Sequence, residues 1–177
     1  MKKIVVIIIT TCFIAGCNHK NIKIMKDIDS TATNFTSNDT IPKVTGIGGI
    51  FFFSDNPEEI KKWYAVNLGL EVNEWGSSFE FRNANRPDEI NYLQWSPFKK
   101  GSKYFAPSKK EFMINYRVQN IEGLVRKLKA NGVSVLDEIE TFEYGKFVHI
   151  LDSEGNKIEL WEPIDSVFTD MGGKTTK

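Results

Sequence analysis

The chain has 177 residues, which is enough for one ordinary domain with a real core. Its hydrophobic fraction of 41% and charged fraction of 26% are typical of a globular protein. The 23 basic side chains balance 23 acidic ones, so charge does not favour nucleic acid as a partner. The sequence also has no Gly-rich phosphate loop, no CxxC pair and no HExxH zinc motif.

Residues 1–17 have the pattern of an export signal. Lys2 and Lys3 precede an apolar run, 4–13, that is too short to span a bilayer comfortably. The run ends in IAGC, which resembles a bacterial lipobox with Cys17 as the residue that receives the lipid. We therefore expect a protein exported from the cytoplasm and lipid-anchored in the bacterial cell envelope. A signal peptide cleaved without lipidation and an uncleaved anchor are the alternatives.

Residues 18–43 are rich in Thr, Asn, Ser and Asp and read as a disordered polar tether. A coil of this length has an r.m.s. reach of about 30 Å, enough to hold a domain clear of a membrane surface. Cys12 is lost with the signal and Cys17 is acylated, so the mature domain has no free thiol. Disulfide bonds and cysteine catalysis are therefore not expected.

The folded domain is expected to begin near Val44, with a strand at 47–53. Asn56-Pro57 is a typical helix start, and Gly69 a typical helix end. Three strands should follow, at 70–74, 78–82 and 91–95. The helix face expected to join the core consists of Ile60, Trp63, Tyr64 and Leu68.

After a basic connector, 99–110, the same order of elements returns. A strand at 111–118 precedes a helix capped by Asn120, and strands follow at 133–139 and in a closing hairpin. The order βαβββ therefore occurs twice in 44–163, which predicts an α+β domain built from two repeats. Residues 164–177 are expected to be a flexible C-terminal tail. The core face of the second helix is expected to contain Ile121, Leu124, Val125 and Leu128.

The closing hairpin has its turn at 152–156, where Asp, Gly and Asn supply the turn chemistry. If the aliphatic residues on its two strands match, His149 and Glu159 lie on the same side of the sheet. A Glu between Ile and Leu in a strand then needs a partner, a cavity or a metal. The alternative is an edge strand whose Glu faces water.

This hairpin resembles the end of the vicinal oxygen chelate superfamily, which includes glyoxalase I, bleomycin-resistance proteins and extradiol dioxygenases. The family motif Asp-x-x-Gly-Asn-x-Ile-Glu-Leu is matched by Asp152, Gly155, Asn156, Ile158, Glu159 and Leu160. Trp63-Tyr64 followed by Leu68-Gly69-Leu70 is similar to the family's helix-to-strand segment. The resemblance covers 44–163 and implies two βαβββ modules that pair into curved mixed sheets around a central cleft.

The resemblance also implies four metal-ligand positions, two in each module. Counting from the helix caps and from the repeated Trp-x-Pro places them at Gly49, Leu93, Met113 and Glu159. Glu159 is the only retained family ligand position with a suitable donor, and one carboxylate cannot hold a catalytic metal. Gln94 is expected to face away by strand alternation. We therefore expect no metal and no other cofactor.

What remains is a metal-free cleft with polar and aromatic lining. The expected ligand-binding residues are Asn115, Arg117, His149, Glu159, Phe51, Phe53, Trp95 and Trp161. Arg117 is the natural anchor for a carboxylate ligand. The alternative is that Arg117 and Glu159 form a structural ion pair, with Asn115 and His149 as satisfied neighbours.

Three functions are compatible with this pattern. The first is a membrane-tethered domain that binds a small organic molecule in the metal-free cleft. The second is a lyase, isomerase or dioxygenase of the glyoxalase family, for which His149 and Glu159 could act as acid and base. The third is a non-catalytic interaction protein, for example a homodimer. No catalytic residue is assigned, and nucleic acid is not expected as a partner.

Overall fold

The computed structural model describes residues 40–84 and 86–177. The expected signal, Cys17 and nearly all of the tether lie outside the described residues. The described residues all belong to one compact unit.

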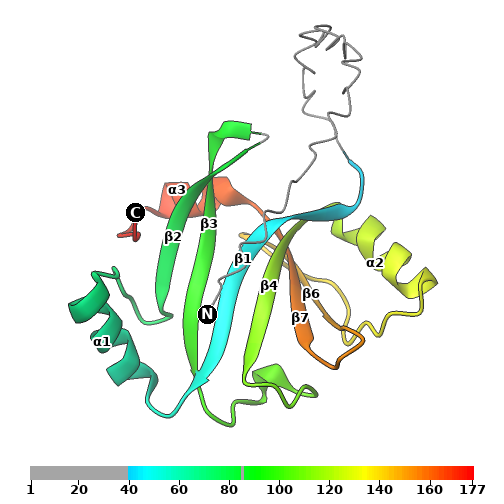
Figure 1. Ribbon diagram of the computed structural model, residues 1–177. Helices are drawn as coiled ribbons and strands as arrows, with labels where there is room; N and C mark the ends of the chain where they lie inside the picture. Colours follow the sequence, from blue (N-terminus) through cyan, green and yellow to red (C-terminus); the bar gives the residue numbers. More distant parts are fainter. Residues whose placement is uncertain (1–39, 85) are drawn as a thin grey trace, which may run out of the picture. The chain divides into compact units, whose positions relative to one another are not determined.

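The domain is built on one seven-stranded mixed sheet with the order β2-β3-β1-β4-β7-β6-β5 (Figure 1). The first strand of each module, β1 or β4, lies at the centre of the sheet, and the two pair antiparallel. β1 pairs parallel with β3, and β4 pairs parallel with β7, so the halves repeat the same arrangement. This confirms the expected α+β fold with a mixed sheet. The strands are β1 (Lys43–Ser54), β2 (Ser77–Asn83), β3 (Arg86–Lys99), β4 (Phe112–Gln119), β5 (Glu140–Phe142), β6 (Gly145–Leu151) and β7 (Lys157–Pro163).

Two of the eight expected strands are nearly absent and one short strand, β5, was not expected, so the sheet has seven strands. The segment 70–74 forms one isolated bridge, Val72 to Ser77, because the side chain of Asn73 accepts from the backbone of Trp75 and Gly76 and turns the chain. The segment 133–139 likewise forms one isolated bridge, and β5 begins after it, at Glu140.

The two helices that the sequence predicts both form. α1 (Pro57–Leu68) is capped by Asn56 and ends at Gly69, whose φ of 72° is the left-handed conformation that glycine tolerates. The predicted core face of α1 is wrong in part, because Trp63 is 52% exposed and Leu68 is also exposed. Tyr64 does pack inward, with its ring centroid 4.7 Å from that of Trp95.

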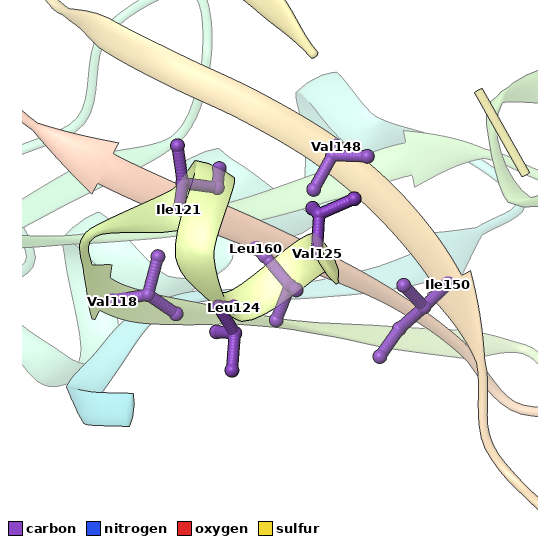
Figure 2. Close-up of a cluster of buried hydrophobic side chains, with 7 residues drawn as sticks. All are labelled: Val118, Ile121, Leu124, Val125, Val148, Ile150 and Leu160. Atoms are coloured by element: carbon purple, nitrogen blue, oxygen red, sulfur yellow. The ribbon is translucent and has the colours of Figure 1, made fainter. Parts of the chain in front are cut away.

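The second helix, α2 (Ile121–Ala130), buries the face that was expected. Asn120 caps it with a hydrogen bond to Gly123 N, and the carboxylate of Glu162 accepts from Asn120 N and Ile121 N. Figure 2 shows α2 packed on aliphatic side chains of one face of the sheet. This face is the outer face, and the opposite one is the inner face. This core cluster consists of Val118, Ile121, Leu124, Val125, Val148, Ile150 and Leu160.

The C-terminal segment is structured, which corrects the expectation of a flexible tail at 164–177. It forms helix α3 (Asp165–Met171) and then returns to the edge strand β2, where Thr176 N donates to Ser78 O at 2.8 Å. Phe168 holds the helix in place by packing against Trp161, Tyr92 and Tyr144. A single aromatic anchor in a short polar segment gives little periodicity, so the sequence pattern did not reveal the helix.

Candidate functional site

The register of the sheet aligns one residue from each of six strands across its inner face. Asn115 of β4 lies between Gly49 of β1 and Glu159 of β7, and His149 of β6 is the next partner of Glu159. Gly49 in turn faces Gln94 of β3. The complete row, in sheet order, is Ser78, Gln94, Gly49, Asn115, Glu159 and His149.

Glu159 is the centre of this row and is only 3% exposed. Its Oε2 accepts a hydrogen bond from Asn115 Nδ2 at 2.5 Å. Its Oε1 accepts from the hydroxyl of Tyr104, which lies on the short 3-10 helix η1 (Lys103–Phe105), and lies 3.0 Å from His149 Nε2. A buried carboxylate needs such partners. Of the two alternatives left open by the sequence, Glu159 has the inward one and does not face water.

His149 connects Glu159 to a second carboxylate. Its Nδ1 lies 2.6 Å from Asp137 Oδ2, and its backbone N donates to Asp137 Oδ1 at 2.7 Å. Carboxylates only accept, so both ring nitrogens can donate only when the imidazole is protonated. Burial lowers the pKa of His149, but the hydrogen bonds to Glu159 and Asp137 and the charge of Glu159 outweigh it and raise that pKa.

Tyr104 and Lys157 complete the cluster on the side of η1. Burial and the charge of Glu159 raise the pKa of Tyr104, so the phenol stays neutral and donates. Lys157 Nζ donates to Tyr104 O at 2.6 Å and lies 5.1 Å from the centre of that ring. Burial lowers the pKa of Lys157.

A cavity of about 810 Å³ opens over the inner face beside this cluster. Asn115 and Glu159 line it from the sheet, and α3 with the residues after it line it from the opposite side. Its aromatic walls consist of Phe51, Trp75, Tyr92, Tyr144, Phe147, Trp161 and Phe168. Such a combination of apolar walls and few polar groups is usual for a small-molecule site.

Four of the eight residues expected in the cleft line this cavity, namely Phe51, Asn115, Glu159 and Trp161. His149 lies behind Glu159 and touches it. The other three expected residues, Arg117, Phe53 and Trp95, do not line it.

Arg117 does not face Glu159, which corrects both sequence interpretations of this residue. Its guanidinium forms an ion pair with Asp165 of α3, donates to Tyr92 O at 3.0 Å and lies 5.2 Å from the centre of the Trp161 ring. It lines a separate cavity of about 460 Å³. The sequence did not predict Asp165 as the partner of Arg117, because its segment was expected to be a flexible tail.

Phe53 and Trp95 also point elsewhere. Phe53 stacks on Phe105, with ring centroids 4.3 Å apart, under the segment that contains η1. Trp95 packs with Phe52 and Tyr64 on the outer face, next to α1. The alignment of the two modules on Trp-x-Pro also gave a wrong position. It assigned Leu93 as the counterpart of Glu159, but the residue in the same row of the sheet is Gln94.

Several site residues gave no signal in the sequence. Tyr104 and Asp137 lie in connecting segments, and both reach the row of polar residues through the fold alone. Tyr144 and Phe147 belong to the closing hairpin, yet their place in the aromatic wall of the cavity depends on the docking of α3.

The row does not fit the metal centre that the resemblance implies. Its members at the four corresponding places are Gly49, Gln94, Asn115 and Glu159, so Met113 and Leu93 were misassigned, and Gln94 faces the cavity rather than away from it. Glycine has no donor, Gln94 Oε1 already accepts from Ser78 Oγ at 2.8 Å, and both oxygens of Glu159 have partners. Within 40–84 and 86–177, no group of three His, Cys, Asp or Glu side chains is arranged to hold a metal.

We therefore predict that the purified chain carries no stoichiometric Zn, Ni, Mn or Fe. Elemental analysis by mass spectrometry checks this directly. The donor set just described is too poor to hold such an ion. One equivalent of metal that disappears in Glu159→Ala would therefore contradict the prediction.

Gly48 lets the central strands approach closely at the cavity wall. A Cβ at this position would lie 2.2 Å from Asn115 Oδ1 and 2.8 Å from the Trp161 ring. Gly48→Ala is expected to lower the free energy of unfolding by about 1–3 kcal/mol through overpacking. Denaturant unfolding measures this, with Gly46→Ala as the matched control, because a Cβ there meets only Arg117 Cδ at 3.8 Å. Equal stability of the two variants would contradict the proposed close contact.

These features define an α+β domain of two related modules with a ligand-sized cavity on the inner face of a mixed sheet. The model of the Glyoxalase/Bleomycin resistance protein/Dioxygenase superfamily matches residues 46–160, and the chain belongs to this family. No curated protein matches the sequence.

Several solved structures are similar to this chain, and the first of those named next shows the same fold. A variant of the Streptomyces coelicolor methylmalonyl-CoA epimerase in complex with 2-nitronate-propionyl-CoA matches with a TM-score of 0.51 and 18% identity, over 69% of this chain and 99% of that one. The Mycobacterium tuberculosis methylmalonyl-CoA epimerase matches with a TM-score of 0.48 and 19% identity, over 70% and 91%. A superfamily member from Vibrio splendidus matches with a TM-score of 0.42 and 13% identity, over 66% and 97%. At these identities the likeness concerns the fold alone.

Proposed function

We propose that the domain binds a small organic molecule in the aromatic cavity, without a metal, and that a lipid on Cys17 tethers it to a membrane of the cell envelope. The cavity is the observation that carries the binding proposal: about 810 Å³ bounded by seven aromatic residues, with two buried polar side chains at the sheet. Asn115 supports it further, because its Oδ1 is buried without a hydrogen-bond partner among the described residues.

The binding proposal can be tested with 1-pyrenemethanol, an uncharged fluorescent probe small enough for the cavity. Saturable binding with one site per chain is expected for the wild type. Trp161→Ala should abolish it, whereas Trp63→Ala should not, because Trp63 is exposed on α1 and does not line the cavity. Circular dichroism must show that both variants are folded. Binding that survives equally in both variants would contradict the proposal.

An acid–base enzyme is the second candidate, favoured by the hydrogen-bonded chain Asp137–His149–Glu159, in which His149 and Glu159 are buried and Asp137 is exposed. In this reading Glu159 removes a proton from a substrate in the cavity, and His149 and Asp137 pass protons to and from it. The epimerase structures suggest a first substrate to try. Deuterium uptake from heavy water into methylmalonyl-CoA, present with the wild type and absent with Glu159→Gln, would support this candidate.

The tether proposal predicts membrane association through Cys17. Cys17→Ser should block acylation and move the protein from the membrane fraction to the soluble fraction. Mass spectrometry of the N-terminal peptide of the wild type should show the acyl mass. Unchanged membrane association together with an unmodified peptide would refute it. No helix in the described part of the chain is long and apolar enough to cross a membrane.

A homodimer is a third proposal, supported by apolar side chains on the outer face of β1. Val44, Ile47 and Ile50 are all exposed. Light scattering after size exclusion measures the mass in solution. A monomer at all concentrations tested would rule this proposal out.

A further inference from the structure

The charge inside the cavity is negative. Two charged residues are found among the described residues that line it, Glu159 and Lys174. The side chain of Lys174 is 85% exposed and lies 3.8 Å from Glu71, so it belongs to the rim. Glu159 is therefore the only charged side chain of the buried lining.

The positive groups nearby do not reverse this sign. Arg117, His149 and Lys157 do not line the cavity, and Arg117 is paired with Asp165. When His149 is protonated, its charge is matched by Asp137, so the three groups that include Glu159 still sum to one negative charge. Lys157 is held against the carbonyl oxygen and the ring of Tyr104, outside the lining, and with its charge added the four groups sum to zero and not to a positive charge.

The aromatic wall favours positive charge for an independent reason. The ring of Phe168 has its centroid 5.5 Å from Tyr92, 5.6 Å from Trp161 and 6.1 Å from Tyr144, so these rings form one continuous surface. Aromatic faces carry negative potential and attract cations within about 6 Å. The wall already attracts one, because the guanidinium of Arg117 lies 5.2 Å from the Trp161 ring.

From these two observations we infer that the ligand is a lipophilic cation, an amine or quaternary ammonium on an apolar body. This rests on the proposed binding function. The apolar body fills the aromatic walls, and the positive group lies near Glu159. A carboxylate or phosphate ligand is disfavoured, because it would be buried beside Glu159 with no cation in the buried lining to compensate it.

Three probes with one pyrene body separate charge from shape: 1-pyrenemethylamine as the cation, 1-pyrenemethanol as the neutral form and 1-pyrenecarboxylate as the anion. Fluorescence titration of the full chain gives their dissociation constants. The cation is expected to bind at least tenfold more tightly than the alcohol, and the carboxylate most weakly. This ranking in the wild type is decisive even if a variant fails to fold.

Glu159→Gln then tests the source of the preference. The ratio of the alcohol and amine dissociation constants should fall toward one in this variant, but should keep its wild-type value in Glu111→Gln, a matched change at an exposed carboxylate outside the cavity. An equal fall in both variants means adsorption to surface charge and overturns the inference. Tightest binding of the alcohol or the carboxylate overturns it as well, but leaves the proposed function standing. Absence of binding by all three probes defeats both.

Discussion

Arg117→Met is expected to lower the free energy of unfolding by about 3–5 kcal/mol, the usual cost of removing one partner from a buried ion pair. Arg117 is 3% exposed, and its guanidinium is paired with Asp165 and hydrogen-bonded to Tyr92 O. Without the guanidinium, the carboxylate of Asp165 loses the cation that compensates its charge. Its Oδ1 already lacks a hydrogen-bond partner within the described chain. Denaturant unfolding followed by circular dichroism measures the loss.

Two further variants make this prediction specific. Adding Asp165→Asn to Arg117→Met should recover part of the lost stability, because the uncompensated charge is removed. Lys100→Met breaks only exposed ion pairs, 4.0 Å to Asp55 and 3.9 Å to Glu111, and should change stability by less than about 0.5 kcal/mol. A similarly small effect of Arg117→Met would show that the pair does not hold α3 on the sheet.

The closing hairpin shows how far local sequence rules reach. Asp152 Oδ1 accepts from the backbone of Glu154 and Asn156, as the turn chemistry predicts. The matched aliphatic faces fix the register, and His149 faces Glu159 as expected. Turn residues and alternation act over a few positions, so they can be read from one sequence.

Strand β1 shows where those rules fail. Its pairing with β4 shifts between Val44 and Gly46 and again between Ile47 and Gly49. Each irregularity interrupts strict alternation, so counting along a strand misplaces side chains beyond it. Of the ligand positions assigned by counting from helix caps and from Trp-x-Pro, Met113 and Leu93 missed the row of polar residues, whereas Gly49 and Glu159 were placed correctly.

The other missed features depend on contacts between distant segments. Tyr104 reaches Glu159 across 55 positions of sequence, and Arg117 reaches Asp165 across 48. Neither pair has a periodic pattern or a motif that marks it. Five of the seven aromatic residues of the cavity wall were not predicted, and Phe168 joins the wall only once α3 has docked against the sheet.

Glu159→Leu should have an effect as large as that of Arg117→Met, about 3–5 kcal/mol, because it removes a buried charge that has partners on both oxygens. The hydroxyl of Tyr104, the amide of Asn115 and Nε2 of His149 would all lose their acceptor. Glu159→Gln is the control: it keeps one carbonyl acceptor and the shape of the side chain, so its loss should be smaller. Equal losses would mean that burial of the side chain, and not its acceptors, stabilises the site.

The same variants should change how stability depends on pH. The pKa of His149 is raised in the folded protein, so the protonated imidazole stabilises the fold fully below the unfolded pKa of about 6.5 and this contribution is lost as pH rises through the folded pKa. Glu159 gives the largest contributions that raise this pKa, and burial opposes them. In Glu159→Gln the pKa of His149 should therefore fall, and the loss of stability above pH 6.5 should shrink. Unfolding curves across this pH range, with NMR titration of the imidazole assigned through His149→Gln, measure both effects. An unchanged His149 titration in Glu159→Gln would show that Asp137 alone holds the proton.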